Sequence, residues 1–277
     1  MNSIYAKVIV TTTIYPLYSV VQEVGKDKVK LNNLIPFGTE PHAFEPTPQN
    51  IVTLLGSDLF IISSSVMEPW ANKIVKANHL EKITIDMSKH VAIKKHTSFK
   101  EGKAFDPHYW LSFDNYIRMV SEVEDLLIEK DAKNSDIYRK NAKNYIKKIK
   151  AIQNEYATLR SCKNKKVIVN HDAFGYLGDD YNIKQYHIAG MSPDEQPSAK
   201  QIAQLINITK KENIHTVFFE EFANDKLSKT IAKEAGVNSE ELSPIGNISK
   251  EAYREHVKFL DIMRKNLVKL KRAMDCQ

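Results

Sequence analysis

Apolar and polar residues follow one pattern in two successive halves of the chain. Short runs rich in β-branched residues predict strands, and stretches with apolar residues at helical spacing lie between them. The predicted strands cover residues 7–13, 28–35, 58–65 and 83–88 in the first half, and residues 165–171, 183–189, 215–221 and 238–244 in the second half. Continuous apolar strands joined by helical crossovers predict parallel sheets that are covered on both faces.

The helical pattern completes this picture of two similar lobes. Predicted helices cover residues 17–25, 47–57, 198–213 and 224–236, and one long terminal helix covers about 249–274. Residues 135–162 also keep a helical spacing of apolar positions, contain no Gly or Pro, and begin at Ser135, which can cap the helix. We therefore predict an α/β fold with an N-terminal lobe (1–134), a rigid linking helix (135–162) and a C-terminal lobe (163–277).

Composition restricts the class of protein. Of the 277 residues, 42% are hydrophobic and 27% are charged, as is typical of folded globular proteins. The net charge is +6, but the densest basic run, residues 140–150, leaves one helix face apolar, which favours a solvated helix over a nucleic-acid site. No apolar run is long enough to span a membrane, and the first 13 residues lack the pattern of a signal peptide, so we expect none in this chain.

The two cysteines are far apart in the sequence. Cys162 and Cys276 show none of the spacings of a zinc finger, so cysteine ligation of a metal is not expected. A disulfide between them would require an oxidising compartment. We expect two unpaired thiols, with the disulfide as the alternative.

Three histidines stand where parallel strands are predicted to end. His42 follows the second strand in "GTEPHAFEPTPQN", His108 occurs in "AFDPHYWLS" after the first sheet, and His171 ends the first strand of the second half. Pro41 and Pro107 restrict the backbone just before two of these rings. Because ligands of such sheets bind beyond the carboxyl ends of the strands, we expect the three rings to meet in one cleft.

The residue types in this cluster suit one kind of metal. Imidazole nitrogens and a tetrahedral arrangement favour zinc, whereas calcium and magnesium prefer oxygen ligands. Four carboxylates lie one to three residues from the histidines and could hold the rings by hydrogen bonds: Glu40, Glu45, Asp106 and Asp172. The sequence therefore predicts a zinc site.

Several motifs, in their order and spacing, resemble those of the metal-specific solute-binding proteins of bacterial ABC importers, the zinc and manganese receptors. They are "IYPLYSVVQEVGKDKV", "EPHAFEPTPQNI", "SDLFIISSS", "DPHYWLS", "NHDAFGYL" and "IAKEAGV", and together they extend over most of the chain. The resemblance implies two (β/α)4 lobes with four-stranded parallel sheets, bridged by one rigid helix. It also implies one divalent ion per chain, carried as cargo to a membrane permease from a periplasmic or lipid-anchored position outside the cytoplasm.

The resemblance also assigns the ligands. The family's PHxxEP motif falls on His42, its DPHxW motif on His108, and its third ligand position on His171, where histidine favours zinc over manganese. The family's usual fourth ligand, an aspartate in an LDPL-type loop, is replaced by Ser243 in "LSPIG". We expect water or a buffer anion as the fourth donor, with Glu220, Glu45 and Ser243 as candidates for positions beside the ligands or for a weak fourth ligand.

The leading interpretation is a monomeric high-affinity zinc receptor that is not an enzyme and binds no nucleic acid. One alternative is a manganese or iron receptor of the same family. Another is a zinc hydrolase with three histidine ligands, but its candidate general bases, Glu220 and Asp172, are too generic to establish one. A purely adhesive surface protein has no supporting feature. The sequence leaves open the metal affinity, the physiological metal, lipidation and the extent of lobe movement.

Overall fold

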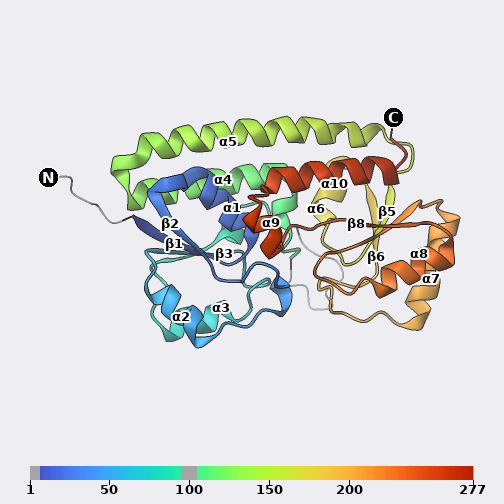
Figure 1. Ribbon diagram of the computed structural model, residues 1–277, viewed down its shortest axis with the longest axis horizontal. Helices are drawn as coiled ribbons and strands as arrows, with labels where there is room; N and C mark the ends of the chain where they lie inside the picture. Colours follow the sequence, from blue (N-terminus) through green and yellow to red (C-terminus); the bar gives the residue numbers. More distant parts are fainter. Residues whose placement is uncertain (1–6, 95–104, 277) are drawn as a thin grey trace. The chain divides into compact units, whose positions relative to one another are not determined.

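Two compact units make up the chain, each built around one sheet (Figure 1). The computed structural model describes residues 7–94 and 105–276. Unit 1 comprises Met1–Lys150 and Gly246–His256, and unit 2 comprises Ala151–Ile245 and Val257–Gln277. Each unit contains a four-stranded sheet whose paired strands are parallel, as the sequence predicts.

Unit 1 has helices on both faces of its sheet. The strands are β1 (Val8–Thr12), β2 (Val29–Asn33), β3 (Leu59–Ile62) and β4 (Thr84–Asp86), in the order β2-β1-β3-β4. The helices are α1 (Tyr15–Gly25), α2 (Pro48–Leu55), α3 (Ala71–Ala77) and α4 (Phe113–Lys130). Figure 1 shows α2 and α3 on one side of the sheet and α1 and α4 on the other. Phe60 and Ile62 of β3 are buried in a core with Leu54 of α2 and Val75 of α3.

Unit 2 repeats this plan. Its strands are β5 (Lys166–Val169), β6 (Lys184–His187), β7 (Thr216–Phe219) and β8 (Asn238–Glu241), in the order β6-β5-β7-β8. Its helices include α6 (Gly175–Tyr181), α7 (Ala199–Lys211), α8 (Lys226–Ala235) and α10 (Phe259–Ala273). All eight predicted strands are therefore confirmed, each a few residues shorter than its predicted range.

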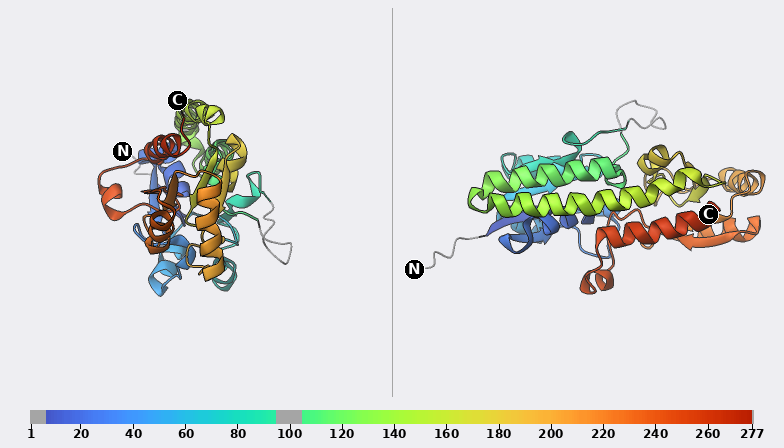
Figure 2. Two further views of the ribbon diagram at one scale, coloured as in Figure 1. Left: turned by 90° about the vertical axis from the view of Figure 1, so that its right-hand side faces the viewer. Right: turned by 90° about the horizontal axis from the view of Figure 1, so that it is seen from above.

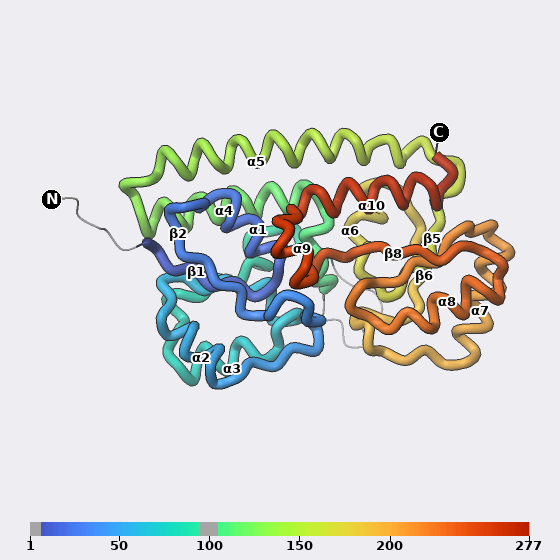
Figure 3. The backbone as a smooth tube through the Cα atoms, in the orientation of Figure 1, coloured from blue at the N-terminus to red at the C-terminus, as the bar shows by residue number. Residues whose placement is uncertain are grey.

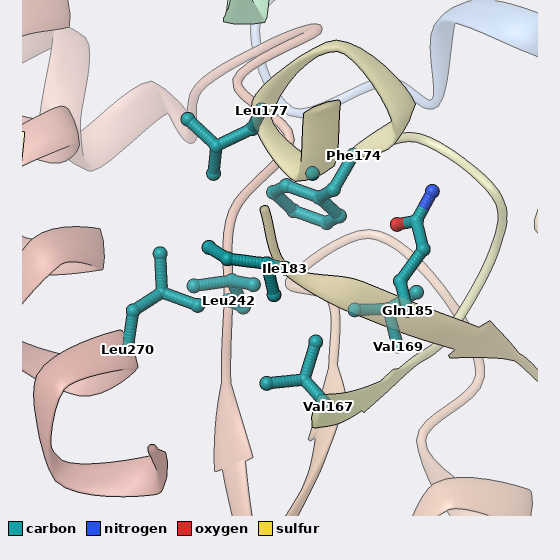
Figure 4. Close-up of a pocket in the computed structure, with 9 residues that line it drawn as sticks. Val167, Val169, Phe174, Leu177, Ile183, Gln185, Leu242 and Leu270 are labelled. Atoms are coloured by element: carbon teal, nitrogen blue, oxygen red, sulfur yellow. The ribbon is translucent and has the colours of Figure 1, made fainter. Parts of the chain in front are cut away.

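Strand β5 shows why these runs are continuously apolar. Ile168 packs into a core formed with α7 and α8. Its neighbours Val167 and Val169 point to the other face, where they line a small apolar cavity together with residues of α6 and α10 (Figure 4). The cavity has a volume of about 10 Å³, the space of a single water molecule. Both faces of the strand are thus covered, so both sets of alternating side chains must be apolar.

The predicted linking helix is confirmed as one continuous helix. Helix α5 covers Ser135–Tyr156, and a 3-10 helix over Ala157–Ser161 extends it. The boundary between the units falls within α5, after Lys150. Helix α4 lies beside α5 (Figure 2), and the hydroxyl groups of Tyr116 and Tyr145 are 3.1 Å apart. Among the described residues, no helix has both the length and the hydropathy to cross a membrane.

The predicted terminal helix is wrong in one respect, because it is two helices. Helix α9 (Lys250–Arg254) ends before His256, whose φ of 56° is left-handed, and α10 begins again after the extended Lys258. The segment Gly246–His256, which contains α9 (Figure 3), packs with unit 1. Its Gly246 carbonyl accepts a hydrogen bond from the Tyr15 backbone amide, 3.1 Å away. Unit 2 therefore lacks this segment of the predicted C-terminal lobe, 163–277, and contains residues 151–162 of the predicted linking helix.

The cysteines are joined in unit 2. Cys162 and Cys276 form a disulfide with a Cα–Cα distance of 4.3 Å, so the expectation of two unpaired thiols is wrong. The chain before β5 and the chain after α10 lie together, as shown by the hydrogen bond from the Asn164 amide to the Met274 carbonyl (3.1 Å). This proximity depends on tertiary packing and has no signature in the spacing of the two residues.

Candidate metal centre

In unit 1, a neighbouring carboxylate orients the His108 ring. One carboxylate oxygen of Asp106 accepts a hydrogen bond from the His108 amide and lies 2.9 Å from its Nδ1. Both residues are buried, and a 3-10 helix over Tyr109–Leu111 follows directly. When Nδ1–H donates a hydrogen bond to this carboxylate, Nε2 carries the lone pair that a metal requires.

The His42 ring faces the His108 ring. It lies in the 3-10 helix Pro41–Ala43, whose first turn is capped by Glu40, since the Glu40 carboxylate accepts a hydrogen bond from the His42 amide (3.1 Å). The Nε2 atoms of His42 and His108 are 3.3 Å apart. Two imidazole nitrogens that face each other at this distance either share a proton or converge on a cation. The two Nε2 atoms are thus close enough together to contact one cation.

The loop that carries His42 is held by the returning C-terminal segment. The side-chain amide of Asn247 donates hydrogen bonds to the carbonyls of Pro36 and Thr39, each 2.8 Å long. Gly38 between them has φ 86°, a left-handed conformation that glycine adopts without steric cost. Residues more than 200 positions away in sequence thus fix the turn that precedes His42.

In unit 2, His171 has the same environment as His108. It follows β5, and its Nδ1 lies 2.6 Å from a carboxylate oxygen of Glu220, which also accepts a hydrogen bond from the His171 amide (3.3 Å). Glu220 follows β7, which pairs with β5 in the sheet, so the two residues meet at the carboxyl ends of neighbouring strands. Both side chains are buried. Again Nε2 is left to bind a metal.

The other predicted residues have different surroundings. Glu45 is exposed and makes no hydrogen bond with the part of the chain that the structure describes. Asp172 accepts a hydrogen bond from the side-chain amide of Gln185 (2.8 Å). The Ser243 hydroxyl accepts a hydrogen bond from the Ile245 amide (3.2 Å) within its own turn. Of the four carboxylates nearest the histidines in sequence, Glu40 and Asp106 each accept a hydrogen bond from a histidine backbone amide.

Sequence reasoning missed one group in unit 1. Glu68 is completely buried, and its carboxylate accepts hydrogen bonds at the ends of two strands. The only sequence signal is an acidic residue in an otherwise apolar and small stretch, "SSSVMEPW". Such a signal is weak, because many acidic residues in similar stretches are exposed to solvent.

Comparisons with known proteins agree with this chemistry. Residues 10–273 match the family model described as ZnuA, zinc-uptake complex component A, periplasmic. The chain is 35% identical over 282 residues to the high-affinity zinc uptake system protein ZnuA of Bacillus subtilis, covering 97% of this chain and 88% of that protein. It is 36% identical to the zinc-binding protein AdcA of Streptococcus pyogenes, of which it spans only 56%. The Zn(II)-bound ZnuA-like domain of Streptococcus pneumoniae AdcA superposes with a TM-score of 0.84 at 34% identity, covering 98% of this chain and 100% of that domain.

Proposed function

This chain belongs to the ZnuA family of zinc-uptake components, and from that premise we propose that it captures Zn²⁺ outside the cytoplasm and delivers it to an ABC-type membrane permease. Proteins of this family are solute-binding receptors and not enzymes, so the bound ion is cargo. The names of the relatives, a zinc uptake protein and a zinc-binding protein, support the choice of metal.

We further propose that His42, His108 and His171 bind one zinc ion through their Nε2 atoms. One observation carries this assignment: His108 and His171 each have Nδ1 and the backbone amide bound to a buried carboxylate. Such a carboxylate selects the tautomer, fixes the ring and raises the basicity of Nε2. Neutral imidazoles with these partners favour zinc over calcium and magnesium, which require oxygen ligands.

The fourth donor in this proposal is a water molecule or an exchangeable anion. Zinc bound by three protein ligands keeps one open position in a tetrahedral arrangement. The Ser243 hydroxyl is engaged in its own turn, and one oxygen of Glu220 is engaged with His171. An exchangeable fourth ligand suits a receptor, because the ion must leave again at the permease.

Titration calorimetry of metal-free protein tests the assignment. Replacing His108 with alanine should weaken zinc binding by orders of magnitude, while replacing the exposed His79 serves as the matched control and should change nothing. Circular dichroism should show both variants folded, because the core cluster around Phe60 and Ile62 does not include either histidine. A His108→Ala variant that binds zinc like the parent would refute the site. Competition with manganese decides between the zinc receptor and the manganese receptor of the same family.

A further inference from the structure

Glu68 is a completely buried acid that the proposed metal site does not use directly. It lies between β3 and α3 in the sequence, and its carboxylate accepts three hydrogen bonds. The Thr13 hydroxyl and the Ser63 amide (3.2 Å) donate to one oxygen, and the Ser64 amide (2.8 Å) donates to the other. Burial raises the pKa of the Glu68 carboxyl to about 7 despite these donors. The group thus ties the chain after β1 to the chain after β3 at a cost in desolvation.

From Ser63 the connection continues to the segment that carries His108. The Tyr109 hydroxyl donates a hydrogen bond to the Ser63 carbonyl (2.9 Å), and it lies 3.0 Å from the Ser63 hydroxyl. Tyr109 is fully buried and directly follows His108. Glu68 therefore holds the backbone of Ser63, and Ser63 holds the residue next to the metal-binding histidine with two hydrogen bonds.

Packing alone does not account for an acid at this place. An apolar side chain of similar volume would fill the space without the desolvation of a carboxyl group. The carboxylate instead provides two acceptors in fixed positions, which satisfy two backbone amides where β3 ends. The hydrogen bonds of these amides fix the backbone of Ser63, whose carbonyl accepts the hydrogen bond from the Tyr109 hydroxyl. A buried hydrogen-bond network of this kind specifies one arrangement of the groups that it joins.

We propose that Glu68 is a positioning residue for zinc binding, which acts through Ser63 and Tyr109 to hold His108 in the orientation that the metal requires. The inference rests on the proposed function. Asp106 fixes the His108 ring from the N-terminal side of the segment, and the network from Glu68 through Ser63 to Tyr109 fixes its C-terminal side. A ligand held from both sides loses little freedom when the ion binds, and this preorganisation favours binding.

The test compares Glu68→Gln, Tyr109→Phe and the double variant. Zinc is titrated into metal-free protein, and intrinsic fluorescence and calorimetry report binding. Trp110 suits the fluorescence signal because its ring lies 5.3 Å from the His108 ring and the chain has only two tryptophans. Tyr116→Phe is the matched control, since Tyr116 is also fully buried in unit 1 and its hydroxyl bonds to Tyr145. Thermal melting of each apo variant measures stability separately.

Each single variant should weaken zinc binding about tenfold, as the loss of a group that supports a ligand commonly does. The double variant should also lose about tenfold and not a hundredfold, because both changes interrupt the same chain of hydrogen bonds. Tyr116→Phe should bind like the parent. Tyr109→Phe keeps the ring and removes one oxygen, so it provides the result even if Glu68→Gln does not fold.

Two results would overturn this inference and leave the proposed function intact. One is a set of variants with lowered melting temperatures and parental zinc affinity, which would make Glu68 purely structural. The other is an additive, hundredfold loss in the double variant, which would place the two residues on separate paths. Failure of the proposed function looks different, because then the parent binds no zinc or His108→Ala binds as well as the parent, and both proposals fall together.

Discussion

Units 1 and 2 each place a buried histidine on a buried carboxylate, but they bring the carboxylate there by different routes. In unit 1, Asp106 precedes His108 by two residues and contacts it within one turn of the chain. In unit 2, Glu220 lies 49 residues after His171 and reaches it because β5 and β7 are neighbours in the sheet. The same chemistry is therefore local in one unit and tertiary in the other, and the two versions should respond differently to mutation.

The units also differ in what stabilises them beyond their cores. Unit 2 is closed by the disulfide between Cys162 and Cys276. Unit 1 contains Glu68, and burial raises the pKa of this carboxyl group to about 7. Four experiments test this comparison of the two units. They change the disulfide, Glu68, and the two carboxylates that contact histidines, Glu220 and Asp106.

The largest expected effect is the loss of the disulfide. Its cysteines are 114 residues apart, and opening a loop of that length should lower the free energy of unfolding by about 5 kcal/mol. Urea denaturation of Cys162→Ser measures the loss, and Cys276→Ser should give the same value, with no further loss in the double variant. Zinc affinity should stay unchanged, because Cys162 precedes β5 and His171 follows it, at opposite ends of the strand. A zinc affinity that falls on reduction would contradict this separation.

The second effect is a pH dependence confined to unit 1. Between pH 4.5, the ordinary pKa of a glutamate, and about 7, the folded protein holds a proton on Glu68 that the unfolded chain has released. The contribution of Glu68 to stability should therefore decrease as the pH rises through this window, by at most about 3 kcal/mol. Hydrogen exchange of unit 1 amides measures how the stability changes with pH. In the Glu68→Gln variant this pH dependence should be absent. An unchanged pH dependence in that variant would assign the effect to another group.

The third effect concerns the tertiary carboxylate. Glu220→Ala leaves Nδ1 and the amide of buried His171 without their acceptor, so zinc affinity should fall about a hundredfold. Stability should also fall, by about 1 to 3 kcal/mol, because a buried donor is left unsatisfied where two strands end. The exposed Glu221→Ala is the control for calorimetry and for denaturation. If the two variants have the same zinc affinity and the same stability, Glu220 does not support His171.

The smallest effect belongs to the local carboxylate. Asp106→Ala should weaken zinc binding about tenfold, because the His108 ring also packs against Trp110 and Tyr109 remains bonded to Ser63. Its stability should change less than that of Glu220→Ala, since the lost hydrogen bonds lie within one turn and join no strands. If both carboxylate variants lose the same stability and the same affinity, the distinction between a local and a tertiary support is not meaningful.

Much of the fold was predictable from the sequence because strands buried on both faces are rich in apolar and β-branched residues. The runs at residues 7–13 and 165–171 therefore indicate β1 and β5. The terminal helix was not predictable in full, since apolar spacing continues on both sides of the break. The break is made by the left-handed backbone of His256 and by the extended backbone of Lys258, after which α10 begins. The apolar pattern does not report either backbone conformation.

The sequence by itself showed three histidines after predicted strands, and an aspartate, Asp106, two residues before His108. Only the tertiary structure decided that Glu220 supports His171, that the cysteines are joined, and that Glu68 reaches Tyr109 through Ser63. The physical reason is the same in each case. The order of strands and the packing of helix ends place residues side by side over long sequence separations, and apolar periodicity carries no information about which strand ends become neighbours.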